Sequence, residues 1–176
     1  MKIKNVVLFF IVCVIMLLNS FCFASIKDSD LEIGGLYYGQ SMDEIVNKYG
    51  DSIRTVITPP VGKEFVFLIN DSEATIRPED GKVIKVTISG NSKLDTLKGI
   101  KIGSTFKETI ALYGEPTFIT NHSGTYCVDY LTPEIIINNS DVVSYHGVLR
   151  FYMSDDTVTN ICFYREYKYK GFPSDW

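Results

Sequence analysis

Two segments of this chain share one pattern of residues, and this internal similarity constrains the fold more than any other feature. Residues 38–52 read YGQSMDEIVNKYGDS, and residues 102–116 read IGSTFKETIALYGEP. Further along, DGKVIKVTI at 80–88 is similar to DDTVTNICF at 155–163. Chance similarity of single segments is common, but two pairs in the same order are not. We therefore predict two tandem copies of one unit.

Each copy begins with the signature of a short helix. A serine or threonine followed three residues later by glutamate has the spacing of a capping box, which satisfies free main-chain N–H groups of a first turn. Apolar residues recur at helical spacing behind it, and a glycine then ends the helix. The signature residues are Gly39, Ser41, Glu44 and Gly50 in the first copy, and Gly103, Thr105, Glu108, Gly114 and Pro116 in the second.

Runs typical of β-strands follow each helix, separated by polar turns. They cover 55–58, 64–70, 74–77 and 82–89 in the first copy, and 117–120, 125–131, 134–138, 148–153 and 157–164 in the second. The fold class we predict is α+β: two tandem repeats, each an N-terminal helix packed on an antiparallel sheet of about four strands. The two sheets should abut or be continuous, with both helices on the same side.

This organisation divides the chain into four parts. Residues 1–24 form a signal peptide, and 25–36 form an N-terminal segment. Residues 37–98 form the first repeat, including a polar linker at 90–98, and 99–176 form the second, which ends in an aromatic C-terminal segment.

The N-terminus indicates export. Lys2 and Lys4 precede an uninterrupted apolar run from Val6 to Leu18, and small residues precede Ser25, as in a secretory signal peptide. An uncleaved membrane anchor and lipidation at Cys22 are the competing interpretations. We predict that the mature chain begins at or near Ser25 and is secreted, periplasmic or held in the cell envelope. Membrane contact is then expected only through the uncleaved signal peptide.

Alternation along the strands assigns one face of the sheet to the core and leaves the other open. The predicted core positions are Phe65, Phe67, Ile69, Ile84, Val86, Ile88, Tyr126, Val128, Tyr130, Leu149, Phe151, Met153, Ile161 and Phe163. The open face carries Glu64, Lys85, Thr87, Cys127, Asp129, Arg150, Tyr152, Asn160, Cys162 and Tyr164. Such a face is either simply solvated or a platform for a protein partner, because tyrosine and arginine are enriched at interfaces.

Export permits a disulfide, and Cys127 and Cys162 share this face. A simple meander places the strand 148–153 between them, which separates their Cα atoms by about two strand spacings, or about 9–10 Å. A disulfide needs less than about 7 Å. We therefore predict no disulfide, with a Cys127–Cys162 bridge as the alternative.

At this point the chain resembles two known families. Tandem helix-plus-four-strand units in an exported chain look like the β-lactamase inhibitor protein family. The segment GIKIGSTFKETIALYGEP also resembles the signature of SmpA/BamE-type outer-membrane assembly modules. The first copy departs from that signature at Ser52, where the second has Pro116. Both families imply a module that binds proteins and catalyses nothing, and the signature residues carry over as structural positions only.

The sequence contains no motif that nominates a catalytic, nucleotide or metal site. There is no G-x-S-x-G, H-E-x-x-H, P-loop or C-x-x-C. His122 and His146 lie beside glycine or a turn-like residue and are expected to be solvated. A formal net charge of −4 argues against a nucleic-acid binder that depends on positive charge. We expect no enzyme activity, no cofactor, no metal and no nucleic acid.

The function expected is a secreted or envelope-associated protein-binding module with an inhibitory or scaffolding role, and its partner another exported protein. The alternative is a binder of a small ligand or cell-wall component in the cleft between the repeats. The candidate partner-binding residues are Arg150, Tyr152, Tyr164, Tyr167 and Trp176.

Overall fold

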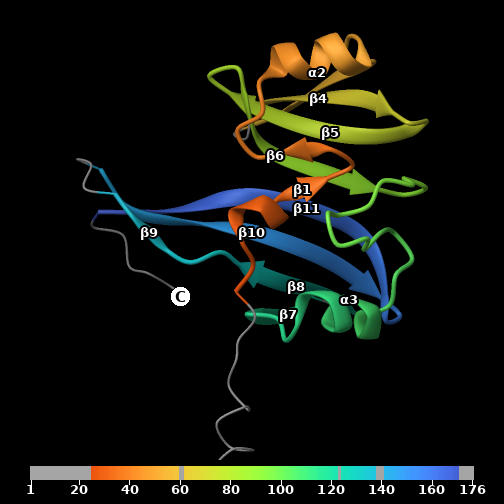
Figure 1. The fold of residues 1–176 in the computed structure, drawn as a ribbon, viewed down its shortest axis with the longest axis vertical. Helices are drawn as coiled ribbons and strands as arrows, with labels where there is room; N and C mark the ends of the chain where they lie inside the picture. Colours follow the sequence, from red (N-terminus) through yellow and green to blue (C-terminus); the bar gives the residue numbers. More distant parts are fainter. Residues whose placement is uncertain (1–24, 60–61, 123, 138–140, 171–176) are drawn as a thin grey trace, which may run out of the picture.

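The computed structural model describes residues 25–59, 62–122, 124–137 and 141–170 (Figure 1). The predicted signal peptide therefore lies outside the described residues. The helices are the 3-10 turn η1 (Asp28–Asp30), α2 (Met42–Tyr49) and α3 (Phe106–Tyr113). The strands are β1 (Glu32–Ile33), β2 (Leu36–Tyr37), β3 (Arg54–Thr58), β4 (Gly62–Ile69), β5 (Ser72–Glu79), β6 (Lys82–Ser89), β7 (Phe118–His122), β8 (Thr125–Leu131), β9 (Ile135–Ile136), β10 (Val142–Ser154) and β11 (Thr157–Tyr169).

One antiparallel sheet dominates the described part of the chain. Its strands run in the order β3-β4-β5-β6-β11-β10-β8-β7. The short strand β9 pairs with the first part of β10, on the edge that β8 occupies further along. The seam is the pairing of β6 with β11, in which Ile88 lies opposite Ile161 and Val86 opposite Phe163. Strands far apart in the sequence are therefore neighbours, and the prediction of one continuous sheet is confirmed.

The predicted α+β class, with two helix-on-sheet repeats, is wrong. The described chain is mostly strand, and the nine-stranded sheet runs through both predicted repeats. Each of the α-helices has only 8 residues, which corresponds to a length of about 12 Å. A helix that short cannot cover four strands, so other segments complete the layer over the sheet.

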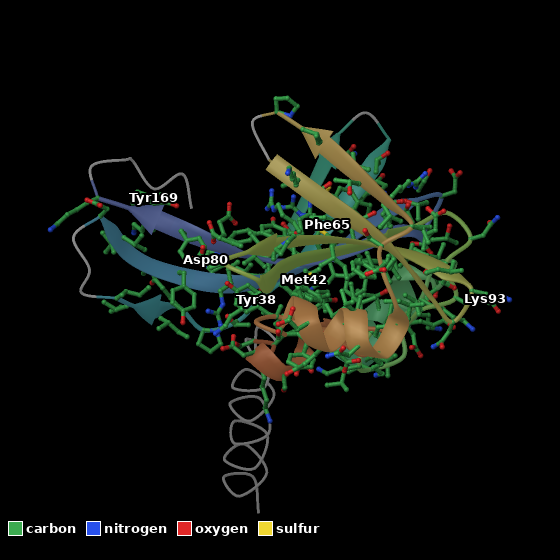
Figure 2. All side chains as sticks on the ribbon, turned by 90° about the horizontal axis from the view of Figure 1, so that it is seen from above. Tyr38, Met42, Phe65, Asp80, Lys93 and Tyr169 are labelled. Atoms are coloured by element: carbon green, nitrogen blue, oxygen red, sulfur yellow. The ribbon has the colours of Figure 1, made fainter. Side chains whose placement is uncertain are left out.

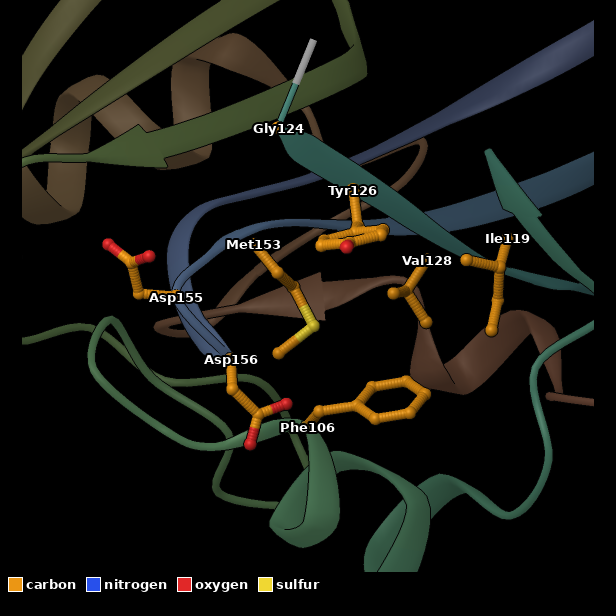
Figure 3. Close-up of a pocket in the computed structure, with 8 residues that line it drawn as sticks. All are labelled: Phe106, Ile119, Gly124, Tyr126, Val128, Met153, Asp155 and Asp156. Atoms are coloured by element: carbon orange, nitrogen blue, oxygen red, sulfur yellow. The ribbon is translucent and has the colours of Figure 1, made fainter. Parts of the chain in front are cut away.

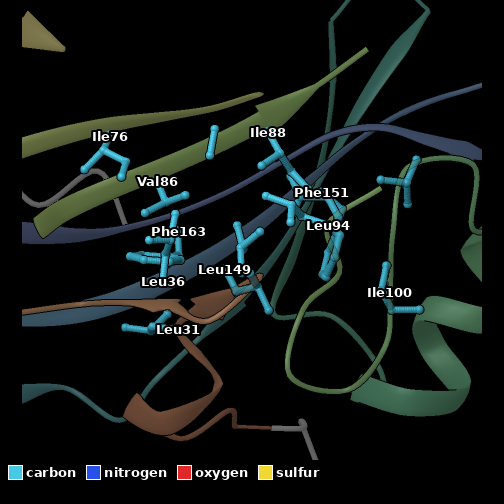
Figure 4. Packing of buried hydrophobic residues seen from close by; sticks show 14 of the residues in the cluster. Leu31, Leu36, Ile76, Val86, Ile88, Leu94, Ile100, Leu149, Phe151 and Phe163 are labelled. Atoms are coloured by element: carbon cyan, nitrogen blue, oxygen red, sulfur yellow. The ribbon is translucent and has the colours of Figure 1, made fainter. Parts of the chain in front are cut away.

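The N-terminal segment and the predicted linker supply that missing cover. Ile26, Leu31, Ile33 and Leu36 are all at most 2% exposed, and the short β1–β2 hairpin carries two of them. Gly147 in β10 makes room for this segment, because a β-carbon there would overlap the side chain of Leu31. Residues 90–98 were predicted to be a polar linker, but Leu94 joins the core (Figure 4).

The core is a single cluster on one face of the sheet, into which both helices pack. Ile45 of α2 and Tyr113 of α3 contact it together with Phe67, Phe151 and Phe163. Figure 2 shows α2 and the N-terminal segment on the same side of the sheet. Most predicted core positions are confirmed, but Tyr126 is 43% exposed.

A β-bulge explains one further error in the predicted core. Lys85 pairs with Arg77, whereas the next pair joins Val83 to Pro78, so Ile84 is an extra residue without an opposite partner. The bulge turns Val83 into the core in place of Ile84, since alternation is interrupted there.

The predicted helix bounds are confirmed, but only one of the two capping boxes forms. Around α3, Glu108 Oε2 accepts from the Thr105 N–H at 2.7 Å, and Thr105 Oγ1 accepts from the Glu108 N–H at 3.2 Å. Around α2, Ser41 Oγ accepts from the Asp43 N–H, while the Glu44 carboxylate accepts from the Tyr37 hydroxyl. Gly50 and Gly114 follow the two helices with φ of 81° and 80°.

Candidate functional site

Strand register places most of the predicted partner-binding residues together on the face opposite the core. We call this side the open face; its central residues form three cross-strand rows. The first row is Asp129, Arg150, Cys162 and Thr87; the second is Cys127, Tyr152, Asn160 and Ser89; the third is Leu131, Val148, Tyr164, Lys85 and Arg77.

Arg150 lies at the centre of the open face and is held in one orientation. Its Nε and Nη2 donate to the two carboxylate oxygens of Asp129, both at 2.7 Å. The guanidinium carbon is 5.9 Å from the ring centre of Tyr152 and 5.5 Å from that of Tyr164. These distances are within the range of cation–π contacts. The two-pronged ion pair and the two rings hold these side chains in a preformed arrangement.

The electrostatics of this group follow from its partial burial. The hydrogen bonds to Asp129 raise the pKa of Arg150 further above its ordinary value, so the guanidinium stays charged at every physiological pH. Burial raises the pKa of both Tyr152 and Tyr164, so both hydroxyls remain protonated. The group of Arg150, Tyr152 and Tyr164 therefore presents two aromatic rings, their neutral hydroxyls and one charge that Asp129 compensates.

Cys127 and Cys162 lie next to this group on the open face as free thiols. Strand β10 separates β8, which carries Cys127, from β11, which carries Cys162, as the meander predicts. Both are buried, and burial raises the pKa of the Cys162 thiol to about 11. A thiol of that kind is a packing group and a poor nucleophile.

The structure separates Tyr167 from the other candidates. Tyr167 lies on the core side of the long β10–β11 hairpin, where its ring is 5.7 Å from Tyr145 and its hydroxyl is 3.2 Å from that of Tyr38. Arg165 lies over the rings of Tyr38 and Tyr145, at 4.0 Å and 4.4 Å. Trp176 lies outside the described residues. The predicted site therefore keeps Arg150, Tyr152 and Tyr164 as one group.

The histidine predictions are only partly tested. His146 was expected in a solvated turn but lies within β10, with its side chain 15% exposed and 3.7 Å from Glu166. The side chain of His122 is outside the described part of the structure. Across the described residues, no three His, Cys, Asp or Glu side chains gather in a way that could hold a metal ion.

A pocket of about 560 Å³, which the sequence did not indicate, lies on the core side at the end of the sheet (Figure 3). Its wall consists of Phe106 from α3 and four side chains from β7, β8 and β10, and the β10–β11 turn lies at its rim. The lining residues are Phe106, Ile119, Gly124, Tyr126, Val128, Met153, Asp155 and Asp156. All of them belong to the second predicted unit, so this pocket is not a cleft between repeats.

A second, more open hollow of about 530 Å³ lies beside the N-terminal segment. Asp28, Glu32, Tyr37 and Tyr38 line it, together with Leu97 from the predicted linker. This hollow is nearer to the boundary between the predicted repeats. Among the described residues, no helix is both long enough and apolar enough to span a membrane.

Comparison with known proteins gives fold-level similarity only. A scan of protein-family models finds no match, and neither does a comparison with curated protein sequences. A cysteine-rich secretory protein from Staphylococcus aureus is similar over 81% of this chain, with 17% identity and a TM-score of 0.50. An extracellular protein containing a SCP domain from Bacillus anthracis is similar over 78%, with 10% identity and a TM-score of 0.49. This chain covers 49% and 50% of those two proteins, about half their length.

The resemblance expected from the sequence receives limited support. The structural neighbours include a candidate β-lactamase inhibitor protein from Streptococcus mutans, which matches 77% of this chain and 85% of its own length at 13% identity. Its TM-score is 0.28, too low to carry an argument about shared architecture. Nothing in these comparisons supports the resemblance to SmpA/BamE modules.

Proposed function

We propose that this protein is an exported, non-catalytic binding module that docks another exported protein on its open face. The observation that carries the proposal is the fixed group of Arg150, Tyr152 and Tyr164 at the centre of that face. Arginine and tyrosine are the residue types most often found among interface hot spots. Because Asp129 already orients the guanidinium, little side-chain entropy is lost when a partner docks.

Two further features support this proposal. Extracellular and secretory proteins are among the structural neighbours, which is compatible with export. The open face is also broad, since each of its three rows crosses the four strands β8, β10, β11 and β6. Such a surface suits an inhibitory or scaffolding role, which needs no reacting group.

A site-specific photo-crosslinker tests where the partner binds. We place it at Thr87 or Asn160 on the open face and, as the matched control, at Leu112, which is 47% exposed on α3. Crosslinks to one exported protein from the open-face positions, and none from Leu112, are expected. Crosslinks from Leu112 alone, or none from Thr87 and Asn160, would contradict the proposal.

The double substitution Tyr152→Ala with Tyr164→Ala then measures how much these two side chains contribute to the binding free energy of the purified partner. Each aromatic anchor contributes about 2 kcal/mol or more, so affinity should fall by well over tenfold. Circular dichroism checks the fold of the double variant, because both tyrosines are partly buried. If the double variant unfolds, Asn160→Arg supplies the test, since it adds bulk to the same surface without removing a core group. Normal binding by a folded variant rejects the open face as the interface.

A further inference from the structure

The pocket of about 560 Å³ lies beside the first turn of α3, between Phe106 and strands β7, β8 and β10. Two cross-strand pairs form its floor and walls: Ile119 with Val128, and Tyr126 with Met153. Val128 and Met153 are buried at the bottom, whereas Ile119 and Tyr126 are 53% and 43% exposed. Together with Phe106, these four side chains form an apolar cup on the core side of the sheet that is open to solvent.

The geometry of the rim is fixed by main-chain bonds. The Phe106 N–H donates to the carbonyl of Asp156 at 3.0 Å, which ties the β10–β11 turn to the first turn of α3. Asp155 and Asp156 both have left-handed backbones, with φ of 48° and 63°. Figure 3 shows the carboxylate of Asp156 beside the Phe106 ring, at the edge of the apolar cup.

The rim carries two carboxylates without a basic partner among the described residues. Neither Asp155 nor Asp156 has an ion pair or side-chain hydrogen bond among the described residues, and no described lining residue is basic. An apolar cup of this size lies within the range of small-molecule sites. Two carboxylates at its mouth disfavour an anionic ligand and favour a positive charge on the part of the ligand that stays in water.

We propose that this pocket binds a small organic cation, with an aliphatic or aromatic body in the cup and an ammonium group at the Asp155–Asp156 rim. The proposal is independent of protein docking, because the pocket lies on the core side and the Arg150 group lies on the opposite face. A hydrophobic side chain from a protein partner is the competing occupant, and it is one outcome of the test.

Three ligands with the same eight-carbon chain separate the roles of the cup and the rim: octylammonium, octanol and octanoate. Binding is followed by NMR of methyl-labelled methionine, which reports Met153 in the pocket and Met42 on α2 as an internal control. Saturable shifts of Met153 without shifts of Met42 are expected. Octylammonium should bind at least about threefold more tightly than octanol, which is within the range that an exposed ion pair contributes. Octanoate should bind more weakly than octanol.

The variant Asp155→Asn with Asp156→Asn tests the rim. Asparagine has the same shape and tolerates the left-handed backbone, so the turn should be retained. Octanol should bind this variant as it binds the parent protein, while the preference for octylammonium disappears. Added salt should weaken the preference in the parent protein, because the rim is exposed.

Several results would overturn the proposal. Equal affinities for octylammonium and octanol in the parent protein would remove the role of charge. Parallel shifts of Met42 and Met153, or shifts that do not saturate, would show non-specific adsorption. Failure of all three ligands, together with weaker binding of the crosslinked partner by Ile119→Ser, would assign the cup to a protein side chain. Weaker partner binding by Tyr152→Ala with Tyr164→Ala leaves this proposal untouched, so the two proposals fail separately.

Discussion

At the scale of single residues, burial decides what each polar group on the open face contributes. Two arginine–carboxylate pairs have the same 2.7 Å separation, Arg150–Asp129 and Arg54–Glu73. The first has side chains 28% and 8% exposed, the second 59% and 52%. Exposed pairs contribute at most about 1 kcal/mol, whereas loss of one partner from a more buried pair leaves a costly charge. Arg150 is therefore anchored in a way that Arg54 is not.

Cys162 makes a pH-dependent contribution to stability. Its pKa is about 11 in the folded protein and about 9 in the unfolded chain, so folding favours the protonated thiol. That stabilisation is complete below pH 9 and is lost as the pH rises towards 11. We expect the free energy of unfolding to fall by about 2 kcal/mol more in the parent protein than in Cys162→Ala across this range.

Urea unfolding at pH 8 to 11 under reducing conditions measures this difference. The variant is the control for buried tyrosines such as Tyr113, because burial raises the pKa of Tyr113 to about 12. Such tyrosines lower the free energy of unfolding of both proteins as the pH rises. Parallel losses in the two proteins between pH 9 and 11 would show that the Cys162 thiol does not carry the effect.

At the scale of elements, similar sequence signatures gave different caps. Both helix starts carry a hydroxyl residue followed by glutamate, and both predicted helices form with the predicted ends. Glu44 nevertheless turns to the Tyr37 hydroxyl, a contact from the N-terminal segment that spacing along the helix does not encode. Local signals therefore predicted the helices and most strand bounds, but tertiary contacts decided which group the Glu44 carboxylate binds.

Removing each glutamate should separate the two caps. Glu108→Ala deletes the acceptor of the Thr105 N–H, and loss of a cap of this kind costs about 1 kcal/mol. Glu44→Ala deletes only an exposed contact to Tyr37 and should change stability by less than about 0.5 kcal/mol. Chemical denaturation of the two variants supplies the comparison. An equal loss from both would mean that α2 has a capping box in solution.

At the scale of the whole molecule, residue patterns predicted the strands but not the layer that covers them. Alternation identified Phe67, Phe151 and Phe163, because a half-buried strand repeats every two residues. No such period marks the N-terminal segment, so its role in the core was missed. Gly147, which makes room for this segment, lay just before the predicted strand 148–153 and gave no signal there. The Arg150 group was found from the alternation of faces, whereas the pocket depends on where the β10–β11 turn meets α3, which no local pattern encodes.

A single core implies that the chain unfolds as one unit. Phe163 lies on the seam strand, and Phe163→Ala should cost about 3–5 kcal/mol. Native-state hydrogen exchange should show the same loss of protection for amides in β5 and in β10, which lie on opposite sides of the seam. Leu112→Ala, at an exposed position, is the control and should change little. Slower exchange retained in β5 alone would reveal two independent halves.

The seam between β6 and β11 also sets the order of events when the chain is made. Strand β6 ends at Ser89, but its partner begins only at Thr157. A chain that emerges N-terminus first therefore exposes an open strand edge, with Val86 and Ile88 uncovered, until almost all of it is available. Pairings between distant segments form slowly and leave the chain open to aggregation in the meantime. Under the proposed export, this late pairing is an advantage, because the sheet cannot close before the last long strand is available.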